Sequence, residues 1–214
     1  MQPPLRDPIR VPPTAPSRLV VLASGTGSLL EALLAAAGGD YPGEVVAVGT
    51  DRACRALEIA AGAGVPSFTV RLGDHTDRAA WDSALTDAVA RHEPDLVVSA
   101  GFMKILGPQF LSCFEGRVVN THPALLPAFP GARAVAEALD YGVRVTGATV
   151  HLVDAGTDTG PILAQKTVPV LDDDDEETLH ERIKVVERRL LVDVLAAVAT
   201  RGLTWTGRKA TFGC

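Results

Sequence analysis

Residues 18–37, RLVVLASGTGSLLEALLAAA, carry three signals in succession that decide the fold. Residues 18–23 are a continuous apolar run, which is typical of a strand buried on both faces of a parallel sheet. Residues 24–28 form a glycine-rich turn, and residues 29–37 repeat leucine and alanine as a helix does. A strand, a tight turn and a helix in this order are the building unit of α/β proteins, so we predict an α/β fold.

The rest of the chain repeats this alternation of strand and helix. Further strands are predicted at residues 44–50, 66–70, 96–99, 117–122, 144–153 and 162–168, and helices at 55–63, 77–92, 132–141 and 179–197. We expect a Rossmann-like, doubly wound, mostly parallel sheet with helices on both faces, in which the final strand or strands run antiparallel. Residues 1–17 contain six prolines and are predicted to be a flexible leader. Residues 18–214 would form a single domain.

Composition limits the classes of partner. The chain has 214 residues and a net charge of −6, which argues against nucleic acid or an anionic membrane as a partner. No apolar run approaches the roughly 20 residues that a membrane span needs. The three cysteines, Cys54, Cys113 and Cys214, have neither zinc-site spacing nor a disulfide framework. A metal-free protein of the cytoplasm is therefore expected.

The glycine-rich turn is a candidate phosphate site. Backbone N–H groups around Gly25, Thr26, Gly27 and Ser28 would converge at a helix N-terminus, where the helix dipole also attracts an anion. A tight turn that merely needs glycine is the alternative. Asp51 follows the second strand and suggests a ribose contact in a dinucleotide site. However, leucine stands where the dinucleotide-binding fingerprint has its third glycine. As a ligand of this turn, we therefore expect a smaller phosphate ester rather than NAD.

Residues 117–127, RVVNTHPALLP, provide candidate catalytic side chains. Asn120 and His122 are two positions apart, so on extended backbone they point to the same side. A neutral amide beside an imidazole, which titrates near neutral pH, suits the stabilisation of a developing oxyanion. A capped strand end followed by a turn is the alternative interpretation.

Three other features have both a functional and a structural interpretation. Residues 100–107, AGFMKILG, could line a pocket for a flat heterocycle or pack under the next helix. Asp158, in the polar loop 154–161, is a turn residue or a carboxylate delivered to the site. Glu187 falls on the apolar side of the last helix, so it lies at the edge of that stripe or reaches into a cleft.

Four motifs taken together resemble the folate-dependent formyltransferase family. They are SGTGS at residues 24–28, AGFMKIL at 100–106, NTHPALLPAFPG at 120–131 and HLVDAGTDTGPI at 151–162. The resemblance spans residues 18 to about 202 and is closest to members that act in purine biosynthesis. It implies transfer of the formyl group of 10-formyltetrahydrofolate, used as co-substrate, to the amine of glycinamide ribonucleotide.

The resemblance also implies roles for individual residues. Asn120, His122 and Asp158 match the catalytic trio, and Gly25, Thr26, Gly27 and Ser28 match the phosphate loop. Glu187 matches a carboxylate near the acceptor amine. The residues that match the folate pocket are Arg78, Met103, Lys104, Ile105, Leu106, Val153, Asp154 and Gly156, of which Arg78 could instead lie near the nucleotide phosphate.

Several related functions stay open at this point. A formyltetrahydrofolate deformylase or a sugar-nucleotide formyltransferase would share the same core. Deformylases carry an extra domain before the catalytic core, where this chain is predicted to have only a short leader. The net negative charge suits a small substrate better than the tRNA that a methionyl-tRNA formyltransferase binds. A nucleotide-binding module without activity would use the phosphate loop alone. We expect small-molecule substrates, and the sequence leaves monomer and homodimer open.

Overall fold

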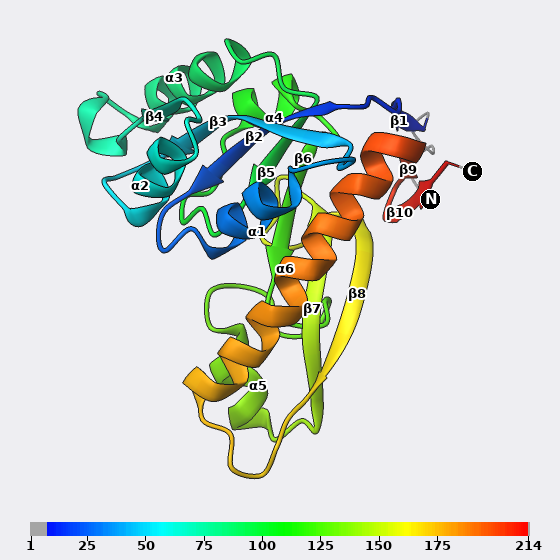
Figure 1. The fold of residues 1–214 in the computed structure, drawn as a ribbon. Helices are drawn as coiled ribbons and strands as arrows, with labels where there is room; N and C mark the ends of the chain where they lie inside the picture. The colour runs from blue at the N-terminus through cyan, green and yellow to red at the C-terminus, as the bar shows by residue number, and fades with distance from the viewer. Residues whose placement is uncertain (1–7, 214) are drawn as a thin grey trace, which may run out of the picture.

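The computed structural model describes residues 8–213 and contains one ten-stranded sheet (Figure 1). The strands lie in the order β1-β9-β10-β8-β7-β6-β5-β2-β3-β4. Their bounds are β1 Ile9–Val11, β2 Ser17–Ala23, β3 Gly43–Thr50, β4 Ser67–Thr69, β5 Leu96–Ser99, β6 Val118–His122, β7 Val145–Leu152, β8 Ile162–Pro169, β9 Leu203–Thr206 and β10 Lys209–Phe212. The helices are α1 Ser28–Ala36, α2 Arg55–Gly62, η1 (a 3-10 turn) Leu72–Asp74, α3 Arg78–Ala90, α4 Pro108–Cys113, α5 Ala134–Tyr141 and α6 Glu176–Arg201.

Helices cover both faces of the parallel part of the sheet. Strand β2 alternates its side chains between the faces: Leu19 and Val21 pack in the cluster that contains α1, α2 and α6. Val20 and Leu22 pack in the other cluster, with Trp81 of α3 and Phe110 of α4. Strands β4, β3, β2, β5 and β6 run parallel. The doubly wound α/β prediction is therefore confirmed.

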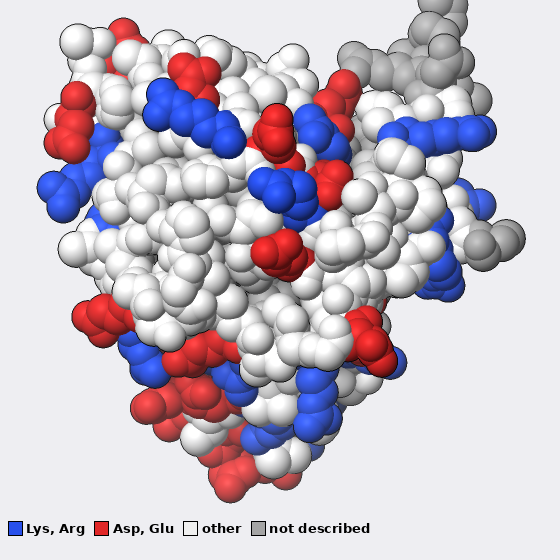
Figure 2. Space-filling view, turned by 45° about the horizontal axis from the view of Figure 1, so that its top comes forward, with Lys and Arg blue, Asp and Glu red and all other residues white. Residues whose placement is uncertain are grey.

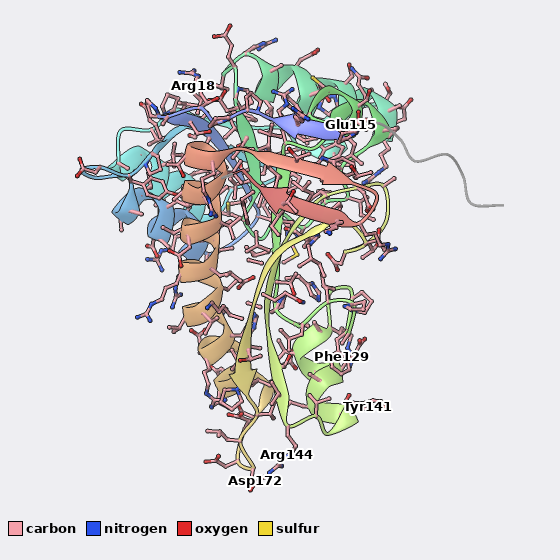
Figure 3. All side chains as sticks on the ribbon, turned by 90° about the vertical axis from the view of Figure 1, so that its right-hand side faces the viewer. Arg18, Glu115, Phe129, Tyr141, Arg144 and Asp172 are labelled. Carbon is pink, nitrogen blue, oxygen red and sulfur yellow. The ribbon has the colours of Figure 1, made fainter. Side chains whose placement is uncertain are left out.

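The other half of the sheet contains the antiparallel strands that were expected. Strand β7 runs antiparallel to both β6 and β8, and together with α6 it extends below the parallel part (Figure 1). At the far end of this extension, Arg144, which precedes β7, forms an ion pair of 2.7 Å with Asp172, which follows β8 (Figure 3). The acidic run before α6 caps the helix: Asp175 accepts from the Thr178 backbone N–H at 2.8 Å in a capping box.

Part of the expected leader is a strand. Residues 1–7 lie outside the described residues, but Ile9–Val11 form β1, which pairs antiparallel with β9. Val11 is buried and belongs to the main apolar cluster. The sequence does not reveal this strand, because its partner lies about 190 positions further along the chain.

Charged side chains of both signs lie on the face drawn in Figure 2. They gather toward its upper and lower parts, and mostly uncharged residues lie between them. Among the helices of residues 8–213, none has the length and apolar content that crossing a bilayer requires.

Candidate active site

A cavity of about 620 Å³ lies at the carboxyl edge of β2, β5 and β6. Its walls come from the loops that follow β2 and β5, the end of β6, the β7–β8 loop and one side of α6. Parallel strands present their carboxyl ends at one edge, so segments far apart in sequence converge there. All the predicted site residues line this cavity except Arg78.

The loop after β2 leads directly into α1. Gly27 adopts a left-handed conformation with φ of 74°, and a Cβ there would lie 2.7 Å from Ile59 Cδ1, so the turn requires glycine. Within the described chain, no side chain caps α1. The N–H groups of its first turn are therefore left for a ligand, in line with a phosphate site at Gly25 to Ser28.

The loop after β5 contains both buried and exposed apolar side chains. Phe102 and Leu106 are buried against α3 and α4, whereas Met103 and Ile105 are 69% and 71% exposed at the rim of the cavity. Arg78 supports this loop from outside. Its guanidinium donates to the Ile105 carbonyl and lies 5.5 Å from the centre of the Trp81 ring.

Strand pairing sets the geometry of Asn120. In the antiparallel register of β6 and β7, Asn120 lies opposite His151, and Asn120 Nδ2 is 3.2 Å from His151 Nε2. His151 Nδ1 is 2.9 Å from the Leu152 carbonyl oxygen, which only accepts, so Nδ1 carries a hydrogen. In the neutral ring Nε2 then accepts from the Asn120 amide. This contact orients the amide and leaves its second hydrogen for the cavity.

His122 is held between two acceptors. Its Nδ1 lies 3.3 Å from Asp158 Oδ2, and its Nε2 lies 2.7 Å from the Phe129 carbonyl oxygen. A carboxylate and a carbonyl both accept, so this arrangement suits the imidazolium, in which both nitrogens donate. The ring is almost fully buried, which strengthens its attraction to Asp158.

Asp158 joins the two histidines. Its Oδ1 lies 3.6 Å from His151 Nε2, and its Oδ2 accepts from the Gly131 backbone N–H at 2.8 Å. The contact with His151, followed by the Gly131 N–H and the charge of His122, lowers the pKa of Asp158 to about 2 although burial opposes this. The residue is therefore a carboxylate throughout the physiological range. Its φ of 54° is unusual for a residue with a side chain and fits a loop shaped for a site.

Helix α6 contributes a second group of polar side chains. Glu187 is buried and lines the cavity, so it reaches into the cleft. Burial raises the pKa of Glu187, while a hydrogen bond with the Thr121 side chain acts in the opposite direction. Lys184, one turn earlier, and His180 also line the cavity.

The prediction from sequence missed three of these residues. His151, His180 and Lys184 were not predicted as site residues, although they lie beside predicted ones. A signal existed for His151, since antiparallel pairing of the two strands places it opposite Asn120. Lys184 could have been found from its spacing of three residues from Glu187, which puts both on one side of a helix.

Comparison with known proteins shows the family. A formyl transferase family model matches residues 17–195. This chain belongs to the formyl transferase family. It is 75% identical over 209 residues to a phosphoribosylglycinamide formyltransferase of Mycobacterium tuberculosis, covering 98% of this chain and 97% of the relative.

Solved structures agree with this family assignment. The structure of glycinamide ribonucleotide transformylase 1 from Symbiobacterium toebii matches with a TM-score of 0.89 at 40% identity, covering 92% of this chain and 94% of that one. A formyltetrahydrofolate deformylase from Pseudomonas syringae pv. tomato matches with a TM-score of 0.85 at 26% identity, and only 66% of its length is covered. Within residues 8–213, no group of three or more histidine, cysteine, aspartate or glutamate side chains could hold a metal ion.

Proposed function

We propose that this formyltransferase moves the formyl group of 10-formyltetrahydrofolate to the amine of glycinamide ribonucleotide, in purine biosynthesis. The observation that carries the proposal is the convergence of Asn120, His122 and Asp158 in one cavity with a helix N-terminus at one side and an apolar rim at the other. Such a cavity can hold an anionic nucleotide and a largely apolar ring system against each other.

The residues present fit the folate co-substrate. It supplies an activated formyl carbon, and the exposed Met103 and Ile105 offer apolar surface for its ring system. On the opposite wall, Asp154 accepts from the Gly156 N–H at 3.0 Å and the Thr159 hydroxyl at 2.6 Å, which fixes the path of the 153–158 loop. We assign Met103, Lys104, Ile105, Leu106, Val153, Asp154 and Gly156 to this subsite, with Arg78 supporting it.

Negative charge develops on the formyl oxygen as the amine attacks. The free hydrogen of the Asn120 amide is directed to this charge by the contact with His151. Donors that are already oriented stabilise such a charge without reorganisation when it forms. The Nε2–H of His122 reaches the formyl oxygen only by sharing or exchanging its bond to the Phe129 carbonyl.

The two carboxylates have different roles in the proposed reaction. Asp158, with its lowered pKa, stays charged and holds His122 as the imidazolium while the attacking nitrogen loses its proton to the leaving nitrogen. Glu187 receives the acceptor amine on the other side of the cavity. Because burial raises the pKa of Glu187, this carboxylate can take the proton from the attacking nitrogen and pass it to the leaving nitrogen more readily than an exposed glutamate.

One assay tests the acceptor. The protein is incubated with 10-formyltetrahydrofolate, with and without glycinamide ribonucleotide, and tetrahydrofolate and formate are both measured. We expect tetrahydrofolate to appear only when the amine is present, without formate. Formate released in the absence of the amine would support the deformylase alternative. A parallel incubation with an amino-sugar nucleotide tests the sugar-nucleotide formyltransferase, which transfer to that acceptor alone would support.

The proposal also covers the cellular location of the enzyme, the extent of its domain and its oligomeric state. We place the enzyme in the cytoplasm, which the free thiols of Cys54 and Cys113 support. We treat residues 18–214 as one catalytic domain. A homodimer is supported by the exposed apolar side chains of Tyr141 and Val145, and sedimentation at micromolar concentration tests it.

A further inference from the structure

Asp51 is the sequence feature that the proposed function leaves without a role. It follows β3 directly, while Ser24 follows β2 and residues 100–106 follow β5. These three strands are neighbours in the order β5-β2-β3, with β2 in the middle. Asp51 therefore lies across the phosphate loop from the loop that carries Lys104.

The carboxylate of Asp51 reaches across this gap. Its side chain is only 2% exposed, and its Oδ2 lies 3.3 Å from Lys104 Nζ and 3.0 Å from Arg52 Nη2. Burial alone would raise the pKa of Asp51, but hydrogen bonds from Arg52, Ser24 and Lys104 lower it below its usual value. The group is thus a fully engaged carboxylate. Because this carboxylate is buried and lies outside the cavity, it cannot contact a ribose bound there, which removes the dinucleotide role suggested by its position after the strand.

Ser24 completes the connection between the two loops. Its hydroxyl accepts from the Met103 backbone N–H at 2.8 Å, and its own backbone N–H donates to the Gly101 carbonyl at 3.2 Å. With its acceptor position used by Met103, the hydroxyl can give its hydrogen to Asp51. Asp51 does not line the cavity, whereas Lys104 and Met103 do. It can therefore act on bound molecules only through the two loops that it holds.

We propose that Asp51 is a positioning residue that couples the ribonucleotide phosphate loop to the folate loop, so that each substrate strengthens the binding of the other. The inference rests on the proposed function, because that function assigns the two substrates to these loops. A ligand that orders residues 25–28 also fixes Ser24 and Asp51, and through them Met103 and Lys104. Coupling of this kind is reciprocal, so it must be found whichever substrate binds first.

The test is a binding experiment on the full chain. The dissociation constant of glycinamide ribonucleotide is measured by calorimetry, alone and with saturating tetrahydrofolate, the product that carries no formyl group. For the unmodified protein we expect tetrahydrofolate to tighten nucleotide binding by about 10-fold, within the usual range for coupled sites. In Asp51→Asn the ratio should fall towards one, with KM raised for both substrates and kcat changed little.

Two further variants separate loop coupling from a general structural effect. Arg52→Gln removes the exposed partner of the same carboxylate but touches neither loop, so its coupling ratio should match that of the unmodified protein. Ser24→Ala should lose the coupling as Asp51→Asn does, and the double variant should lose no more than either single one. If Asp51→Asn does not fold, Asp51→Ser is measured in its place.

The results also separate this inference from the proposed function. A protein that transfers no formyl group to the ribonucleotide would contradict the proposed function. A protein that does transfer it, but whose coupling is absent or survives in Asp51→Asn, overturns the role of Asp51 alone.

Discussion

Asn120 is the residue whose removal isolates oxyanion stabilisation most cleanly. Its Nδ2 contacts only His151 among the described residues, so Asn120→Ala leaves the packing of β6 nearly intact. We expect kcat to fall by about 10²–10³-fold, as for other lost oxyanion donors, with substrate dissociation constants nearly unchanged. Steady-state rates together with calorimetric binding measure the two quantities. Gln109→Ala, which deletes an exposed amide bonded to Ser83, is the matched control and should keep the full rate.

Asp158 links the site to the stability of the protein. Its folded-state pKa of about 2 lies below its ordinary value of 3.8, so its stabilisation is complete above about pH 4 and is lost as pH falls through 2. Asp158→Asn should therefore lower the free energy of unfolding by about 2 kcal/mol at pH 7, and the difference should shrink as acid is added. Urea unfolding at several pH values measures this. The same experiment on Asp172→Asn, an exposed ion-pair partner, should show a change within about 0.5 kcal/mol at every pH, and an equally flat difference for Asp158→Asn would refute the argument.

At the scale of elements, the β7–β8 pair depends on close backbone approach. A Cβ on Gly147 would lie 2.1 Å from the Lys166 carbonyl oxygen, an atom that cannot move without breaking the pairing. We expect Gly147→Ala to cost about 3 kcal/mol, at the upper end for overpacking. Gly62, at the exposed end of α2, has no atom within 4 Å of such a Cβ. Gly62→Ala should therefore stabilise by up to about 1 kcal/mol, and chemical denaturation of both variants checks the contrast.

Sequence reasoning succeeded for elements whose signal is local. The apolar runs of β2, β3 and β5 and the helical periodicity of α3 and α6 depend on neighbouring residues alone, and each lies within a few positions of its predicted bounds. It did not find β1, because three residues pair with a strand at the other end of the chain. The six-residue helix α4 was also missed, since it is too short to show a helical period.

The residues of the candidate site also divide into those with a local sequence signal and those without one. Motifs that occupy consecutive positions, such as residues 24–28 and 120–122, could be recognised from the sequence. Contacts that depend on tertiary geometry could not. Asp51 reads as a candidate ribose ligand, and only the arrangement of β5, β2 and β3 reveals its ion pair with Lys104. Phe129 likewise carries no sequence signal for its carbonyl contact with His122.

At the scale of the whole molecule, the cavity exists only in the folded chain, because its walls come from segments between residues 25 and 187. A substrate that binds the native state alone raises its stability by about 2.7 kcal/mol at 100 times the dissociation constant. For a chain of this size that corresponds to a rise in Tm of about 5–10 °C with glycinamide ribonucleotide.

Ser28→Asp should abolish most of this rise, because a carboxylate at the start of α1 repels the phosphate while remaining favourable for the helix itself. Ser28→Ala, which adds no charge, should keep most of it. Differential scanning fluorimetry of the three proteins distinguishes these outcomes, and an undiminished rise in Ser28→Asp would place the phosphate at another part of the cavity.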